Sequence, residues 1–391
     1  TPRTLFPYTT LFPISKTSPS YQPSSGQHFA NVNRGSGMLT SFLLSVCPNI
    51  VHLDLIEDDD VLLTGPEEAD EDARREQARN AALVYLATTT HMTSQLRDFR
   101  LRTWPRVSYA VMLDVLSRCR SLRNLCIFGA GPCLPYQTCT PSCPTIPTFD
   151  FPNLRRVDFF ACAAHLAARI IAGAPMLHTV EWTHTGKPGR MPSFPAIETS
   201  STVRILSCRS IRYAFGEADE VALDVAASIS ALSTFIASFP FIHTLDLFID
   251  RIPVAGLVYS KATPPPPAVA SDFFSRLPAT VRHIQASGPD ILPLLLSSGP
   301  YITEGRLPPL EDLELGWVGE MSVDDWKPVA YACQAASIAM KGNLGIAVRK
   351  HMIAQVQLEL LRLEDEVRVA REQWRLRGAK VPAHSAELPR G

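Results

Sequence analysis

A six-residue pattern, apolar-x-x-apolar-x-apolar, recurs nine times along this chain of 391 residues. The end of each copy alternates apolar and other residues, which is typical of a short strand with one buried face. A unit that repeats along a chain predicts a solenoid, in which each unit packs on its neighbours. The nine copies, called hexads below, are Ile50–Leu55, Leu96–Leu101, Leu122–Ile127, Leu154–Phe159, Leu177–Trp182, Val203–Cys208, Ile242–Leu247, Val281–Ala286 and Leu310–Leu315.

The distance between successive hexads, measured at their fourth positions, ranges from 23 to 46 residues. The shorter distances match the period of leucine-rich repeats, about 20–29 residues. The longest, from Leu53 to Phe99, is twice the shortest. We therefore expect one degenerate or insert-bearing repeat between these two hexads.

The segments before the hexads also repeat. Four of them place apolar residues at helical spacing, namely Leu39–Cys47, Val111–Cys119, Ala164–Ala174 and Ile229–Phe239. A proline stands two residues before five hexads, at Pro48, Pro152, Pro175, Pro240 and Pro308, and proline ends a helix and favours extended neighbours. Each unit is thus predicted to be helix, corner and strand, giving an α/β leucine-rich-repeat solenoid with a concave parallel sheet and convex helices.

We divide the chain into four parts. Residues 1–37 are predicted to be disordered and partly artefactual, because Thr4–Phe12 resembles a translated sequencing adapter. Residues 38–320 form the solenoid. Residues 321–378 form a helical segment, in which Asp324–Lys341 is the first predicted helix, and residues 379–391 form a disordered tail.

The second helical stretch, Leu344–Arg377, carries a heptad pattern. Its apolar residues seven apart are Ile346, Ile353, Leu360, Val367 and Trp374. Two interpretations remain open. The helix either forms a coiled coil, giving a homodimer through residues 344–377, or it caps the solenoid or packs on its flank.

Composition excludes several kinds of partner. The net charge is −1, which offers no electrostatic basis for binding nucleic acid or an anionic membrane, and no apolar run reaches the length of a membrane span. The nine cysteines are scattered without a C-x-x-C pair, which favours a reducing, cytoplasmic or nuclear location.

Aligned hexads reveal two rows of charge. The fifth positions should face the concave surface, and their acidic members are the candidate partner-binding residues Asp54, Asp158, Glu181, Asp246 and Glu314. The second positions are basic or histidine in seven hexads, at Arg97, Arg123, Arg155, His178, Arg204, His243 and Arg282. Either the acids receive a basic peptide, or neighbouring repeats pair these charges with little net stabilisation.

Three aromatic residues follow directly after hexads, at Phe128, Phe160 and Phe248. If they are exposed, they are candidate hydrophobic anchors for a protein partner.

We find no catalytic constellation and predict no enzyme activity, cofactor or metal site. Cys133, Cys139 and Cys143 lie close in sequence, but their spacing differs from that of zinc knuckles and no nearby histidine completes a set. The turn Gly129–Pro132 lacks the residues of a nucleotide-binding loop.

The segments CPNIVHLDL, CRSLRNLCIFG, FPNLRRVDFFAC and FPFIHTLDLF resemble the irregular leucine-rich repeats of fungal F-box-like proteins, over about Met38 to Gly316. The resemblance implies an adaptor whose repeats select a substrate while an F-box docks on a ubiquitin-ligase scaffold. The F-box motif itself is not seen before the repeats. The alternative is a self-associating scaffold that uses the C-terminal coiled coil.

Overall fold

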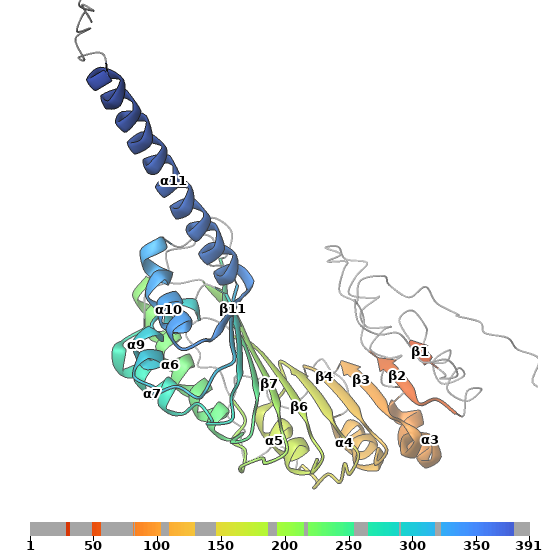
Figure 1. Cartoon of the computed structure of the whole chain (residues 1–391). Helices are drawn as coiled ribbons and strands as arrows, with labels where there is room; N and C mark the ends of the chain where they lie inside the picture. Colours follow the sequence, from red (N-terminus) through yellow and green to blue (C-terminus); the bar gives the residue numbers. More distant parts are fainter. Residues whose placement is uncertain are drawn as a thin grey trace, which may run out of the picture.

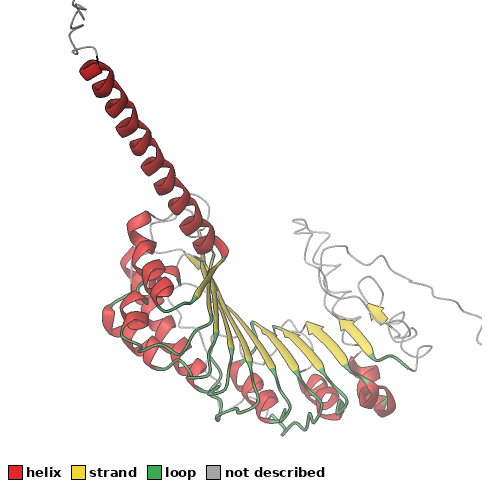
Figure 2. Ribbon diagram, in the orientation of Figure 1, coloured by secondary structure: helices red, strands yellow, loops and turns green. Residues whose placement is uncertain are grey.

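The computed structural model describes residues 29–31, 49–55, 81, 83–102, 109–129, 146–186, 194–214, 218–253, 265–288, 291–316 and 322–378. Within these ranges the strands form one 11-stranded sheet whose spatial order is the chain order, and every neighbouring pair is parallel. The sheet curves, with helices along its outer side and the strands lining the inner side (Figures 1 and 2). The fold is therefore a solenoid-like α/β fold.

Each hexad coincides with one strand. Nine strands begin at the third hexad position, and β6 to β8 continue well beyond the hexad, so the sheet is widest there. These strands are β2 (His52–Leu55), β3 (Asp98–Arg102), β4 (Asn124–Phe128), β5 (Arg156–Phe160), β6 (Thr179–Gly186), β7 (Ile205–Ala214), β8 (Thr244–Pro253), β9 (His283–Ser287) and β10 (Asp312–Leu315).

The helices lie between the strands in sequence. They are α3 (Thr90–Gln95), α4 (Tyr109–Arg118), α5 (Ala164–Ala172), α6 (Ala218–Ala237), α7 (Pro267–Ser275), α8 (Leu292–Leu296), α9 (Gly299–Thr303) and α10 (Val323–Ala335). Three of the four predicted helices are thus present as α4, α5 and α6. The fourth, Leu39–Cys47, lies outside the described residues.

The core is one continuous layer between the sheet and the helices. The fourth hexad positions, from Leu53 to Leu313, are all buried, as are the apolar faces of α4 and α5. At the centre, Trp182 of β6 lies 5.8 Å from Phe159 and 6.2 Å from Phe235, measured between ring centroids. The buried apolar side chains of the hexads, which stand at every second position of each strand as predicted, therefore pack against the helices.

The structure corrects two details of the predicted organisation. β2 and β3 pair directly, with Leu53 opposite Phe99, so the 46-residue distance is one unit with a long insertion and not two units. The predicted helix Asp324–Lys341 ends at Ala335, after which Ala339–Lys341 forms strand β11 beside β10. A residue with positive φ, Ser337 at +59°, makes this turn from helix to strand.

Two strands have no hexad. β11 closes one end of the sheet, and β1 (Phe29–Asn31) pairs with β2 at the other end. Because β1 lies within the segment 1–37, for which we predicted no regular structure, it is an addition to the predicted fold. Both strands are short and pair with a neighbouring strand in parallel.

The final helix, α11 (Gly342–Gly378), projects away from the sheet (Figure 1). Its first three turns are anchored, because Leu344 is buried and Trp326 of α10 packs edge-on against His351 at 5.7 Å. Between Met352 and Arg375 its apolar side chains are exposed, including Ile353, Leu360 and Val367. Within this structure, α11 does not cover the solenoid.

Candidate protein-binding surface

Strand register brings the fifth hexad positions into one continuous row across the sheet. The row runs Asn31, Asp54, Arg100, Cys126, Asp158, Glu181, Ser207, Asp246, Gln285, Glu314 and Lys341, each residue opposite the next. All five acidic candidates therefore lie on the same face of the sheet. Among the described residues no helix lies on that face, which is on the inside of the curve (Figure 2).

The acids of this row have cationic neighbours on the same face. Arg100 Nη1 donates to Asp54 Oδ2 at 2.9 Å, and Asp54 is buried. Arg156 bridges two acids: its Nε lies 3.0 Å from Asp158 Oδ1 and its Nη2 lies 2.5 Å from Glu181 Oε1. The acidic stripe is thus partly neutralised from within the sheet.

The other two acids are also engaged or flanked. Asp246 accepts a hydrogen bond from Ser207 Oγ at 2.8 Å, and Arg209 Nη2 lies 3.7 Å from the same carboxylate. Glu314 lies opposite Lys341 in the register, and its charge contributes to raising the pKa of that lysine, although Asp312 contributes more. None of these cations comes from the second hexad positions.

The crowding of charge at the centre of the row affects two titrating groups. Partial burial, and then the neighbouring carboxylate of Asp158, raise the pKa of Glu181 above its ordinary value. Burial chiefly, with Asp158 next, raises the pKa of the Cys126 thiol to about 12. Cys126 is therefore a protonated thiol at neutral pH and not a reactive thiolate.

The three aromatic candidates share a second row, two residues further along the strands. Phe128 and Phe160 are opposite each other and stack, with ring centroids 4.8 Å apart and planes inclined by 23°. Phe248 stands in the same row, beside Arg209 and Ser287. All three are half-buried and not fully exposed, so each presents part of a ring to the inner face.

The third hexad positions hold polar pairs that the sequence reasoning did not single out. His52 of β2 contacts Asp98 of β3, and His283 Nδ1 of β9 lies 2.7 Å from Asp312 Oδ2 of β10. Lys341 Nζ of β11 also donates to Asp312 Oδ2, at 2.8 Å. The sequence could have predicted both pairs, because each places a His and an Asp at the third position of consecutive hexads.

The second hexad positions form a separate row at the border where the strands begin. Arg97, Arg123, Arg155, His178 and His243 are exposed, and Arg204 and Arg282 are half-buried. This basic row is called the second-position row below. It does not share the inner face with the acids.

The described part of the chain contains no cluster of side chains suited to a metal ion, since no group of three or more His, Cys, Asp or Glu side chains in it is placed to hold one. Cys133, Cys139 and Cys143 lie outside the described residues. The helices that the structure describes include none with the length and hydropathy to cross a membrane.

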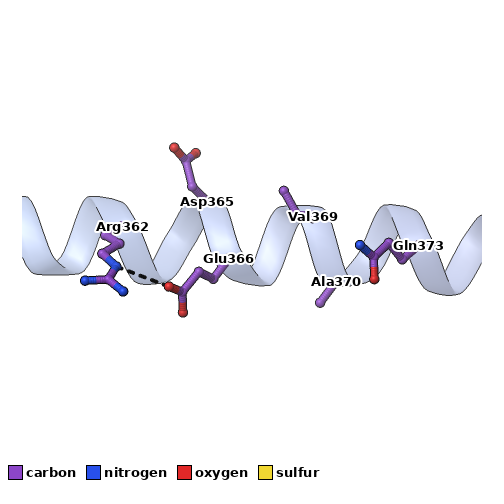
Figure 3. A pocket seen from close by; sticks show the side chains of 6 residues that line it. All are labelled: Arg362, Asp365, Glu366, Val369, Ala370 and Gln373. Carbon is purple, nitrogen blue, oxygen red and sulfur yellow. Dashed lines mark hydrogen bonds and ion pairs between the residues drawn. The ribbon is translucent and has the colours of Figure 1, made fainter.

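A shallow depression on α11 offers no enclosed site either. Six residues of that one helix line it: Arg362, Asp365, Glu366, Val369, Ala370 and Gln373 (Figure 3). Arg362 Nε and Glu366 Oε1 pair across one turn at 3.2 Å. A surface formed by a single helix cannot bury a small ligand as a concave site does.

Comparison with known proteins adds no relative. The sequence matches no protein-family model, and a search of curated proteins finds no match.

Proposed function

We propose that this chain is a protein-binding leucine-rich-repeat solenoid and the substrate-recognition part of an F-box-type ubiquitin-ligase adaptor. The hexad period supports the repeat class, and the resemblance to fungal F-box-like proteins supports the adaptor role. The chain contributes binding and no chemistry of its own. Its bound partner is a protein that lies on the inner face of the sheet.

The observation that carries the proposal is the mixed polar and aromatic surface of the inner face, on which no described helix lies (Figure 2). The Phe128–Phe160 stack is adjacent, along β5, to the Arg156–Asp158–Glu181 cluster. Aromatic side chains and arginine are enriched in protein interfaces. A partner would cover the exposed parts of the rings and exchange the intramolecular ion pairs for intermolecular ones.

The test compares affinity capture by the wild-type chain and by inner-face variants. Phe160→Ala removes one ring of the stack, and the double variant Asp158→Arg/Asp246→Arg reverses two acids. The matched control is Tyr331→Ala, which removes an aromatic ring that is 57% exposed on α10, away from the sheet. We expect both inner-face variants to capture at least tenfold less of the same partner protein than the wild type, and the control to capture as much as the wild type.

Unchanged capture by both inner-face variants would refute binding on this face. The adaptor role has a separate test in the coding sequence upstream of this chain. An F-box there, and a ligase scaffold that co-purifies only with the longer chain, are the expected results. A longer chain that binds a substrate without any scaffold would reject the ligase role and leave the binding role intact.

A second candidate function, a self-associating scaffold, is favoured by α11. Its residues seven apart are exposed, with Ile346 at 44%, Ile353 at 59% and Trp374 at 78%. Such a stripe is what a second helix covers in a coiled coil. This candidate and the substrate-binding role use different parts of the chain and do not exclude each other.

Sedimentation velocity tests this second function. Leu360→Lys/Leu363→Lys places charges on the stripe, and Gln355→Lys adds a charge at an exposed position outside it. A dimer that survives the control and is lost in the double variant supports the scaffold. A monomeric wild-type chain at every accessible concentration refutes it.

A further inference from the structure

The second-position row has an unusual backbone setting. In the units of β3 to β10 the N–H groups of the second and third positions both donate to the carbonyl of the preceding unit's second position. Arg123 and Asn124 donate to Arg97 O at 2.7 and 3.0 Å, for example. The same arrangement recurs up to Glu311 and Asp312, which donate to Arg282 O. As in a β-bulge, two successive N–H groups share one acceptor, and the second residue, which directly precedes the strand, has an exposed or half-buried side chain.

This arrangement sets an even spacing along the row. Its seven basic or histidine residues directly precede seven consecutive strands, β3 to β9, without interruption. Neighbouring strands lie about 4.8 Å apart, so the row is about 30 Å long. Glu311 of the next unit ends it.

The cations of this row differ from those of the inner face in having no carboxylate partner among the described residues. Arg100, Arg156 and Arg209 on the inner face each have a carboxylate within 4.0 Å. In the described part of the chain, no ion pair joins any residue of the second-position row to a carboxylate. The three arginines that precede neighbouring strands, Arg97, Arg123 and Arg155, are therefore held side by side against their mutual repulsion.

Two of the arginines are also pre-positioned. Arg204 Nη1 donates to Ser201 O at 2.8 Å, and Arg282 Nη1 donates to Ala279 O at 3.1 Å. Each guanidinium keeps further N–H groups for an external acceptor, because it has five donors. A side chain already held in place loses less conformational freedom when it binds.

We propose that the second-position row binds an extended acidic peptide segment of a partner protein. An extended chain rises about 3.3 Å per residue, so about nine residues match the length of the row. Carboxylates on such a segment would accept hydrogen bonds from the guanidinium groups, which suit carboxylate geometry.

Two exposed apolar side chains beside the row favour a peptide over a nucleic acid. Met176 and Phe241 precede the hexads of β6 and β8 and are 58% and 45% exposed. Lying two strands apart, they are about 10 Å from each other. The Arg204 guanidinium lies between their strands and 5.6 Å from the Phe241 ring centroid. Apolar side chains interspersed among acids would meet both Met176 and Phe241.

The proposal concerns the border of the sheet and not its inner face, so it does not depend on the adaptor role. The probe is a fluorescein-labelled nine-residue peptide, Glu-Glu-Leu repeated three times, whose binding is followed by fluorescence anisotropy. A nine-nucleotide single-stranded DNA serves as the competing class of polyanion. Both are titrated with the full chain at low and at moderate salt.

The test variant is Arg123→Glu/Arg155→Glu. The matched control is Lys350→Glu/Arg375→Glu, which makes the same change of net charge at two exposed positions of α11. We expect the peptide to bind the wild type and the control with Kd values within twofold. We expect the test variant to weaken it at least tenfold, and Phe241→Ala to weaken it at least threefold. Thermal melting checks that each variant folds, and Arg123→Gln/Arg155→Gln replaces the test variant if it does not.

Three outcomes would overturn the proposal. The first is no peptide binding by the wild type, and the second is equal weakening in the control, which would indicate bulk charge alone. The third is tighter binding of the DNA than of the peptide, with the DNA binding lost in the Arg123→Glu/Arg155→Glu variant. That result would assign the row to nucleic-acid binding. None of these outcomes bears on inner-face capture, so this proposal and the proposed function fail separately.

Discussion

Gly288, at the end of β9, has a backbone that only glycine adopts without strain. Its φ is +100°, and a Cβ built there would lie 2.2 Å from the carbonyl oxygen of Ile249 in β8. Gly305 also has positive φ, +66°, but a Cβ there meets nothing within 4 Å. The two positions therefore separate backbone strain from steric clash.

We predict that Gly288→Ala lowers the free energy of unfolding by about 3 kcal/mol or more, because strain and clash add. Gly305→Ala, the matched control, should lower it by only about 1 kcal/mol, from strain alone. Urea unfolding followed by circular dichroism measures both. Equal losses in the two variants would show that the backbone of β8 yields to the added methyl group.

Asp312 links three strands, since it accepts from His283 of β9 and from Lys341 of β11. Partial burial alone would raise its pKa, but the hydrogen bonds from Lys341 and His283 outweigh it and lower the pKa below the ordinary 3.8. The ionised form is therefore bound more tightly in the folded state. Its contribution is present above the unfolded pKa and is lost as the pH falls through the folded pKa.

We predict that Asp312→Asn destabilises the fold by about 1 kcal/mol at neutral pH, an estimate reduced for the exposure of Lys341. The difference between wild type and variant should persist at about pH 5 and shrink below pH 3.8. Urea titrations at about pH 7, 5 and 3 measure it. If the difference in the free energy of unfolding between wild type and variant stays constant down to about pH 3, the ionised carboxylate of Asp312 is not the source of the stabilisation.

Among the elements, α11 combines an anchored start with an exposed remainder. Leu344 is fully buried, whereas the side chains from Met352 to Arg375 are exposed. The two portions should differ in their effect on the stability of the solenoid.

We predict that ending the chain after Met352 leaves the thermal midpoint of a monomer unchanged within about 2 °C, because little buried surface is lost. Leu344→Ala should cost about 2–5 kcal/mol through the cavity it creates. Differential scanning calorimetry at a concentration where the chain is monomeric compares them. A large loss on truncation would show that the distal helix contacts the solenoid.

The elements also show what the sequence could predict. Hexad periodicity located nine strands and their register, because an apolar residue every second position in a short segment has one buried face and therefore one register. The position of the five acidic candidates on one face followed from that alignment. Their ion-pair partners did not follow from the alignment. Arg156 pairs along its own strand with Asp158 and across strands with Glu181, and Arg209 pairs across strands with Asp246.

The missed elements have physical reasons. β11 follows a helix without a hexad, and only its pairing with β10 makes Ala339–Lys341 extended. β1 likewise gains its conformation from β2. The shared carbonyl at each corner is a hydrogen bond between units more than twenty residues apart, and composition of a single unit does not reveal it.

At the scale of the whole molecule, units contact chiefly their neighbours. The strands follow one another in the sheet in chain order. A destabilising substitution in a unit at one end therefore has few direct contacts through which it could affect the units at the other end. Leu53 of β2 and Trp182 of β6 are both buried, one near an end and one at the centre.

We predict that Leu53→Ala reduces amide hydrogen-exchange protection in β2 and β3 while β7 to β9 keep theirs. Trp182→Ala should reduce protection on both sides of β6, because its ring contacts Phe159 and Phe235. Hydrogen-exchange mass spectrometry at single-strand resolution distinguishes the two patterns. A uniform loss in both variants would show that the chain unfolds as one cooperative unit.

The shared-carbonyl corner has a consequence for the gene. Each unit is joined to the next by the same bonds at the same hexad positions, whatever the number of residues between the hexads. An in-frame duplication or deletion of one whole unit would therefore create a junction identical to those already present. We expect related genes to differ more in the number of units and in the number of residues between hexads than in the pattern of the hexads themselves.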